Sequence, residues 1–235
     1  MFESLKKKKY RDKYGLFIIE EVHLIEEAMK NFALETLIVR EGVDSIFDFS
    51  DTIFVSDQVM KKLSGNVSLN DYIGICSIDK GTFKPEYQKY IVLEDVQDPG
   101  NVGTILRTAL SFGFEDVILS TGCADVYNEK TIKASQGAIF HLNIVRMETD
   151  HIIKLLKLWK YQIIVTALND STDLEDFDVS KRYALVFGNE GNGISGKMME
   201  AADDRIRIKM ENFDSLNVAI AAGICMYDFR RKRKE

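Results

Sequence analysis

The spacing of apolar residues predicts that strands and helices alternate along most of the chain. Four apolar runs, YIVLEDV, DVILS, QIIVTAL and YALVFGN, are rich in Val, Ile and Leu, as strands buried on both faces of a sheet are. Helical spacing between and after them predicts helices near residues 101–112, 128–135, 151–160, 196–202 and 215–231. This alternation predicts an α/β fold with a mostly parallel sheet and helices on both faces.

The first 79 residues show a smaller pattern of the same kind. A short apolar run is followed by helical spacing from Val22 to Phe32, then by the strand-like runs TLIVRE, TIFVS and DYIGICSI and the helix-like SDQVMKKLS. The segment DKGTFKPEYQ has little periodicity and contains Gly81 and Pro85. We therefore expect a small α/β domain at 1–80, a linker at 81–88 and a larger domain at 89–235.

Composition restricts the class of protein further. The chain is 46% hydrophobic and 29% charged, which fits a globular protein, and no apolar run approaches the roughly 20 residues of a membrane span. No apolar stretch follows the basic N-terminus, so we expect no secretory signal and a cytoplasmic location. Cys76, Cys123 and Cys225 lack paired spacing, and the three histidines lack metal-ligand spacing. Buried thiols and no metal site are expected.

Charge is unevenly distributed along the chain. The net charge is −6, but residues 6–13 and 230–234 each carry about +5, which leaves about −16 on the rest. Basic ends on an acidic body are typical of a localised contact with phosphate. We expect Lys6 to Lys9, Arg11 and Lys13 to contact phosphates, with solvated charge runs as the alternative.

Three segments that follow predicted strands carry the candidate chemistry. In the first, EDVQDPGNVGTILRTALSFG, Asp98-Pro99-Gly100 predicts a turn, Asn101 can cap the next helix, and Gly103 allows a close approach of the backbone. Arg107 follows nearly two helical turns after Asn101. The patterns G-x-G-x-x-G and G-x-x-x-x-G-K-[ST] are absent, which disfavours dinucleotide and ATP binding. A plain helix cap and a surface ion pair remain alternatives for Asn101 and Arg107.

The second and third segments lie later in the chain. In LVFGNEGNGIS three glycines surround Asn189 and Glu190 directly after a strand, so backbone amides and carbonyls are open to a ligand. In ENFDSLNVAIAAGICMYDFRR, Asp214 or Ser215 is expected to cap a helix, and Asn217 lies in its first turn, where its side chain can reach a ligand. The small residues that follow favour close packing of that helix.

Together the three segments resemble the SpoU (TrmH-type) RNA ribose methyltransferases of the SPOUT superfamily. The motifs are Asn101-x-Gly103-x-x-x-Arg107, the loop Leu185-Val186-Phe187-Gly188-Asn189-Glu190-Gly191-x-Gly193, and Ser215-Leu216-Asn217-Val218-Ala219. The resemblance covers about residues 89–231. Less specifically, the N-terminal part resembles the small substrate-binding domain common in these enzymes.

The resemblance implies a C-terminal trefoil knot that binds S-adenosylmethionine, and transfer of its methyl group to a ribose 2′-hydroxyl in tRNA or rRNA. It also implies a homodimer with the site between two subunits. The implied cofactor contacts are Gly188, Asn189, Ile208, Met210 and Leu216. The implied catalytic residues are Arg107, Asn101, Glu190, Ser215 and Asn217. The alternatives are a non-catalytic RNA-binding protein on the same fold and, by fold analogy alone, a nucleotide-dependent enzyme or a signalling domain.

Overall fold

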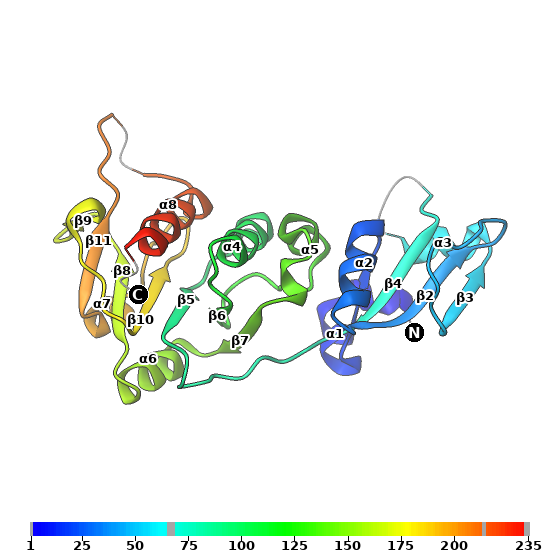
Figure 1. Ribbon diagram of the computed structural model, residues 1–235, viewed down its shortest axis with the longest axis horizontal. Coiled ribbons are helices and arrows are strands. Elements are labelled where there is room, and N and C mark those ends of the chain that lie inside the picture. Colours follow the sequence, from blue (N-terminus) through cyan, green and yellow to red (C-terminus); the bar gives the residue numbers. More distant parts are fainter. Residues whose placement is uncertain (1, 65–68, 213–214, 233–235) are drawn as a thin grey trace.

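The computed structural model describes residues 2–64, 69–212 and 215–232 and arranges them around two β-sheets (Figure 1). A four-stranded sheet has the order β1-β4-β2-β3, and a seven-stranded sheet has the order β7-β6-β5-β10-β8-β11-β9. Figure 1 shows the small sheet on the right and the large sheet on the left, with the segment before β5 running between them.

The small sheet is mixed, because β2 pairs in parallel with β3, while β4 pairs antiparallel with both β1 and β2. Helix α2 buries Leu24, Ile25 and Ala28 against it, as the helical spacing predicts. Phe32 lies beyond the end of that helix and is 93% exposed. The elements are β1 (Leu16–Ile19), α2 (Val22–Lys30), β2 (Leu34–Arg40), β3 (Thr52–Val55), α3 (Asp57–Leu63) and β4 (Tyr72–Ser77).

The N-terminal basic run is folded, and two of its basic side chains, Lys6 and Arg11, contact other parts of the chain. It forms the 3-10 helix η1 (Phe2–Lys6) and helix α1 (Lys8–Tyr14). Arg11 is only 6% exposed; its Nη1 donates to the carbonyl of Leu5, and its Nη2 lies 2.5 Å from Asp125 Oδ2. Lys6 Nζ donates to the carbonyls of Lys62 and Ser64. The predicted phosphate contact is therefore wrong for Arg11, which is buried and paired with Asp125. Lys6 links the N-terminal segment to the end of α3.

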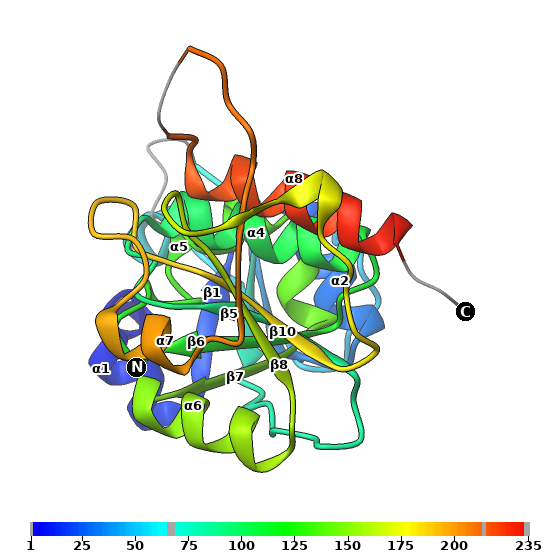
Figure 2. The ribbon, with the colours of Figure 1, turned by 90° about the vertical axis from the view of Figure 1, so that its left-hand side faces the viewer.

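All pairings in the large sheet are parallel, which confirms the predicted α/β fold. Figure 2 shows α6 and α7 below the sheet and α4, α5 and α8 above it. The strands are β5 (Lys89–Leu93), β6 (Asp116–Ser120), β7 (Asn143–Met147), β8 (Gln162–Thr166), β9 (Thr172–Asp173), β10 (Tyr183–Phe187) and β11 (Asp204–Arg207). The helices are α4 (Pro99–Ser111), α5 (Glu129–Ser135), η2 (Ala138–Phe140), α6 (Thr149–Leu158), η3 (Leu174–Asp176), α7 (Gly196–Ala201) and α8 (Val218–Arg231).

Three strands of this sheet, β7, β9 and β11, have no counterpart among the apolar runs of the sequence. β7 and β9 are the edge strands and β11 lies beside β9. In β7 only Val145 is buried, and in β11 only Ile206. Strands that bury one residue do not show the continuous apolar run of a central strand, so their periodicity is too weak to predict them.

The acidic segment NDSTDLEDFD packs against the body, although its sequence is that of a solvated loop. It contains β9 and η3, and it buries Leu174 and Phe177. Lys232 Nζ donates to the carbonyls of both residues and pairs with Asp228. The described part of the C-terminal basic run therefore also includes a structural contact, while residues 233–235 lie outside the described residues.

One hydrophobic core continues from the small sheet into the large one. Phe17 of β1 packs on Tyr127, with ring centroids 4.7 Å apart, and Glu27 Oε2 lies 2.7 Å from His141 Nε2. The three cysteines are buried, as expected. Among the residues described, no helix has both the length and the apolar character needed to cross a membrane.

Replacing Arg11 by Met tests the contact between α1 and the large sheet. The substitution removes the buried guanidinium and leaves the half-buried Asp125 carboxylate without its partner, and we expect the free energy of unfolding to fall by about 3 kcal/mol. Chemical denaturation measures the change. Lys9→Met, at an exposed position of the same helix, is the control and should stay within about 0.5 kcal/mol. Equal stability of the two variants would contradict a structural role for Arg11.

Candidate active site

The three segments singled out by the sequence meet at the carboxyl edge of the large sheet. The first follows β5, the second follows β10, and β5 and β10 are neighbours. The third precedes α8, which packs beside α4 on the upper face of the sheet (Figure 2). This edge is where parallel α/β sheets bind ligands.

The loop after β10 is closed on itself. Asn189 N donates to Gly193 O at 3.0 Å, and Gly193 N donates to Asn189 O at 2.9 Å. A Cβ on Gly188 would collide with the backbone of Gly193, so only glycine allows this closure. The Asn189 side chain accepts from the amides of Gly191 and Asn192 and donates to the carbonyl of Asp95 at 2.8 Å. Its side chain therefore shapes the loop, and the polar groups left for a ligand are those of the backbone.

Glu190 joins this loop to the first segment. Its Oε1 accepts hydrogen bonds from the Asp98 amide and from Asn101 Nδ2, and its Oε2 accepts from the Gln97 amide, each at 3.0 Å. Burial by itself raises the pKa of Glu190, but the hydrogen bonds from Asn101 and from the two amides outweigh it and lower the pKa below its usual value. The ionised carboxylate accepts three hydrogen bonds from the first segment and so positions that segment against the loop.

Asn101 links the first segment to the third. Its Oδ1 accepts a hydrogen bond from Asn217 Nδ2 at 3.0 Å, and Asn217 Oδ1 accepts from the amide of Ala219 at 2.9 Å.

The residues that cap α4 and α8 differ from those expected from the sequence. Asp98 caps α4 by accepting from the Asn101 amide, because the helix begins at Pro99, two residues before Asn101; Asn217 itself caps α8, and Asp214 lies outside the described residues.

Gly103 allows the first segment to pack closely against α5. A Cβ at this position would collide with the carbonyl of Thr131 in α5, so α4 and α5 pack with their backbones close together. The close approach expected from the sequence is thus to a neighbouring helix. It also brings the start of α5 beside Asp98, whose Oδ2 lies 2.7 Å from Lys130 Nζ. That ion pair, with the Asn101 amide, lowers the pKa of Asp98.

A cavity of about 240 Å³ lies between the glycine loop and the start of α8. Its walls include every residue proposed from the resemblance to hold the cofactor: Gly188, Asn189, Ile208, Met210 and Leu216. Glu190, Ser215 and Asn217 also line it. Thr166, Ala167 and Leu168, which no sequence motif singled out, also line it. Thr166 ends β8 and the other two residues follow it directly. Their place at the carboxyl end of a predicted strand is the signal that could have identified them.

Arg107 and Asn101 are not among the lining residues of this cavity. Arg107 is exposed on α4 and takes part in no ion pair among the described residues. Helix α8 runs beside α4: Asn217 bonds to Asn101, Gly223 faces Thr108, and Tyr227 contacts Phe112. Arg107 therefore lies on the exposed side of α4, the helix beside which α8 runs. The structure thus joins Asn101, Glu190 and Asn217 and leaves Arg107 facing outward.

Comparisons with known proteins identify the family of the chain. Residues 88–227 match the SpoU rRNA Methylase family, and residues 1–70 match the MRM3-like substrate binding domain. The chain is 30% identical over 97% of its length to the 23S rRNA (guanosine(2553)-2'-O)-methyltransferase RlmP of Bacillus subtilis, of which 94% is covered.

Solved structures show the same fold over the whole chain. A putative RNA methyltransferase of the TrmH family from Porphyromonas gingivalis is 28% identical, with a TM-score of 0.87, covering 99% of this chain and 96% of that one. An AdoMet-bound rRNA methyltransferase from Sinorhizobium meliloti is 27% identical, with a TM-score of 0.85, covering 100% and 94%. The fold and the site define a methyltransferase of the SpoU class. The chain belongs to the SpoU rRNA methylase family.

Replacing Glu190 by Gln tests the connection between the first two segments. The neutral amide offers one acceptor oxygen instead of two, and we expect unfolding to require about 1 kcal/mol less at pH 7. The folded-state pKa of Glu190 is lowered, so its stabilisation is complete above the unfolded value of about 4.3 and is lost as pH falls through the folded value. The gap between Glu190→Gln and wild type should therefore close below about pH 4. Denaturation at several pH values measures it, and a gap independent of pH would contradict the role of the charge.

Proposed function

We propose that this protein is an S-adenosylmethionine-dependent RNA methyltransferase that methylates a ribose 2′-hydroxyl in rRNA or tRNA. The observation that carries the proposal is the hydrogen-bonded chain from Glu190 through Asn101 to Asn217, which holds three motifs around one cavity. The names of the relatives support it: RlmP acts on a guanosine 2′-O, and the Sinorhizobium enzyme binds AdoMet.

The cavity suits S-adenosylmethionine. Its walls are apolar at Leu168, Ile208, Met210, Leu216 and Val218, and the closed glycine loop adds backbone polar groups beside them. Apolar walls with a few placed polar groups fit a ligand that has both a flat ring and many hydrogen-bonding groups. When bound, the cofactor supplies a methyl group on a positively charged sulfur. We propose Gly188 and Asn189 as contacts through their backbone.

The acceptor hydroxyl needs orientation and the loss of a proton. Glu190, Asn101 and Asn217 are engaged with one another, so we propose that they position the loops, while Ser215 on the cavity wall contacts the substrate. Arg107 is exposed and forms no ion pair within the described part of the chain. A guanidinium stays protonated in proteins, so we propose that it clamps phosphate and stabilises the developing alkoxide, while the proton of the hydroxyl passes to solvent water.

We also propose that the protein is a homodimer formed through α8. Ile220, Ile224 and Tyr227 are spaced to lie along one side of this helix, Leu216 directly precedes its cap, and each of the four is at least 40% exposed. An apolar stripe of this kind marks an interaction surface. It begins at the cavity and lies on the helix that packs beside α4, which carries Arg107, so we propose that a second copy docked there brings Arg107 to its partner's cavity. A partner's arginine would then complete each site.

We propose the division into a substrate-binding domain at 1–80, a linker at 81–88 and a methyltransferase domain at 89–235, with the C-terminal part threaded as a trefoil knot. The two separate sheets support the division. The linker packs on the large sheet, because Thr82 N donates to Asn143 Oδ1 and the ring of Phe83 stacks on that of Tyr90. It is thus a fixed connection.

Replacing Arg107 by Ala tests the proposed activity. We expect methyl transfer from S-adenosylmethionine to RNA from cells lacking the protein to fall at least about 100-fold, the loss typical of one transition-state charge contact. Calorimetric titration with S-adenosylhomocysteine, with chelator present, should give the same affinity as wild type within a few fold. No binding to the wild type would refute the cofactor assignment. Binding without any transfer by the wild type would favour the non-catalytic alternative.

Charges placed on α8 test the dimer. Ile220→Asp with Ile224→Asp should convert a dimer into a monomer in sedimentation analysis, because a dimer would bury both charges. Ile46→Asp, at a 66% exposed site in the small domain, is the control. If Arg107 acts across the dimer, mixing Arg107→Ala subunits with Gly188→Val subunits should restore transfer, since one hybrid site is intact. If hybrid dimers form but show no methyl transfer, Arg107 acts in the site of its own subunit.

A further inference from the structure

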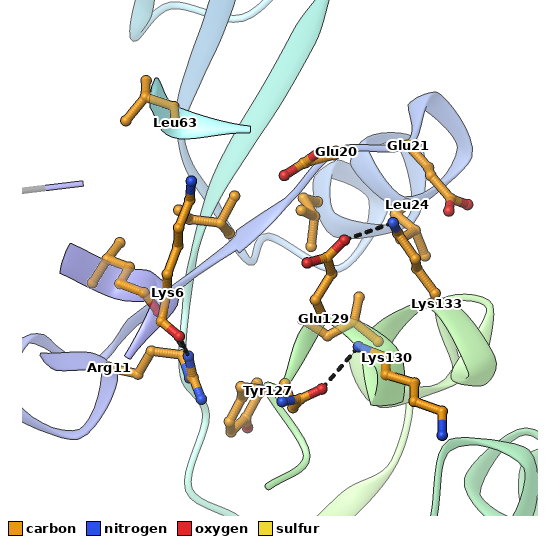
Figure 3. Close-up of a pocket in the computed structure, with 15 residues that line it drawn as sticks. Lys6, Arg11, Glu20, Glu21, Leu24, Leu63, Tyr127, Glu129, Lys130 and Lys133 are labelled. Atoms are coloured by element: carbon orange, nitrogen blue, oxygen red, sulfur yellow. Dashed lines mark hydrogen bonds and ion pairs between the residues drawn. The ribbon is translucent and has the colours of Figure 1, made fainter. Parts of the chain in front are cut away.

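A second and larger cavity, of about 510 Å³, lies where the small sheet meets α5. Figure 3 shows Lys6 and Arg11 on one side of it, Glu20 and Glu21 above, and Glu129, Lys130 and Lys133 of α5 on the other side. The volume falls within the range of about 300–1,000 Å³ that is typical of small-molecule sites. It is formed by the residues matched to the substrate-binding domain together with those of the methylase family.

The inner surface of this cavity is apolar and includes an aromatic ring. Ile18, Ile19 and Leu24 come from the small domain, and Ile132 comes from α5. Tyr127 is half-buried on the lower side in Figure 3, where its ring packs on Phe17 and its hydroxyl donates to the carbonyl of Asp79. A ring fixed at both ends is a rigid surface on which a flat ligand can stack.

The charged groups at the cavity nearly cancel. Four basic and three acidic side chains line it, and one of the basic groups, Arg11, is already neutralised by Asp125. Glu129 and Lys133 form an ion pair of 2.7 Å at the start of α5, with side chains 52% and 35% exposed. A phosphate would lie close to three carboxylates. A nucleobase fits better, because its edge presents hydrogen-bond donors and acceptors side by side and its faces are apolar.

The cavity is connected to the candidate active site through Asp98. Lys130 lines the cavity and its Nζ lies 2.7 Å from Asp98 Oδ2, while the amide of Asp98 donates to Glu190 at 3.0 Å. Residues of the two cavities are thus joined by two short contacts across the first turn of α4. One RNA strand can therefore reach both sites with neighbouring parts of its chain.

We propose that this cavity is a nucleobase site that receives an unstacked base of the RNA substrate close to the methylated ribose. Tyr127 and the isoleucines contact its faces, and the Glu129–Lys133 pair contacts its edge. The proposal rests on the proposed function for the identity of the ligand. Single-stranded bases turned out of the stack are the usual means by which proteins recognise RNA sequence.

Methyl NMR with labelled isoleucines tests the site directly in the intact protein. The probes are the four nucleoside 5′-monophosphates, with ribose 5-phosphate as the base-free control. We expect at least one mononucleotide to shift Ile18 and Ile132 with saturation, while ribose 5-phosphate leaves them unchanged and the exposed Ile46 does not respond. S-adenosylhomocysteine should instead shift Ile208, which lines the cofactor cavity.

A charge-neutral double variant tests the site during turnover. Glu129→Gln with Lys133→Gln removes the ion pair without changing the net charge, so general attraction to RNA phosphates stays the same. We expect about tenfold more RNA to be needed for half-maximal methyl transfer, with kcat and S-adenosylhomocysteine affinity unchanged. The matched control is Asp150→Asn with Lys197→Gln, an exposed ion pair of 2.9 Å on the lower face of the large sheet, which should have no effect.

The outcomes separate the two proposals. An unchanged RNA requirement in the Glu129/Lys133 variant, or Ile18 and Ile132 shifts that ribose 5-phosphate reproduces, would overturn the nucleobase site. Mononucleotides that shift no methyl of this cavity would do the same. Failure of S-adenosylhomocysteine to shift Ile208 would count against the proposed function instead, because that response does not depend on the second cavity.

Discussion

The hydrogen-bonded chain Glu190–Asn101–Asn217 is the constraint on which the site depends. These residues come from three segments that are far apart in sequence: the start of α4, the loop after β10 and the cap of α8. The Glu190 carboxylate takes two backbone amides and one side-chain amide, and both ends of the Asn101 side chain are occupied. These hydrogen bonds lie at the exposed edge of the sheet, so each contributes modestly, but together they link all three segments in one arrangement.

The location of the site could be predicted from the sequence, but the roles within it could not. Motifs at strand ends identified Asn101, Glu190 and Asn217, and parallel strands bring their ends to one edge. Which side chain caps α4 depends on where the helix begins, and this helix begins at Pro99, two residues before Asn101. Asn101 is thereby freed to bond sideways to two other loops. Only the three-dimensional packing shows that its side chain links loops and does not cap.

The basic ends show a similar limit of sequence reasoning. A run of like charges has the same pattern whether it is solvated, bound to a polyanion or used in folding. Arg11 is buried against Asp125, and Lys232 holds the carbonyls of Leu174 and Phe177. Their partners lie more than 50 residues away in the sequence, so no local pattern reveals them. Long-range pairing of this kind also converts an apparent acidic loop at Leu174 into part of the core.

An acidic protein that acts on RNA needs a means of recognition other than overall charge. With Arg11 and Lys232 committed to the fold, fewer cations are available for phosphate, and the net charge of −6 opposes general attraction. Contacts to bases do not suffer this repulsion, because a base is uncharged and its stacking faces are apolar. A near-neutral cavity beside Tyr127, two contacts from Glu190, is consistent with recognition of this kind. In the proposed function, Arg107, exposed on α4, supplies the cationic contact to ribose and phosphate, so that binding and chemistry use different parts of one nucleotide strand.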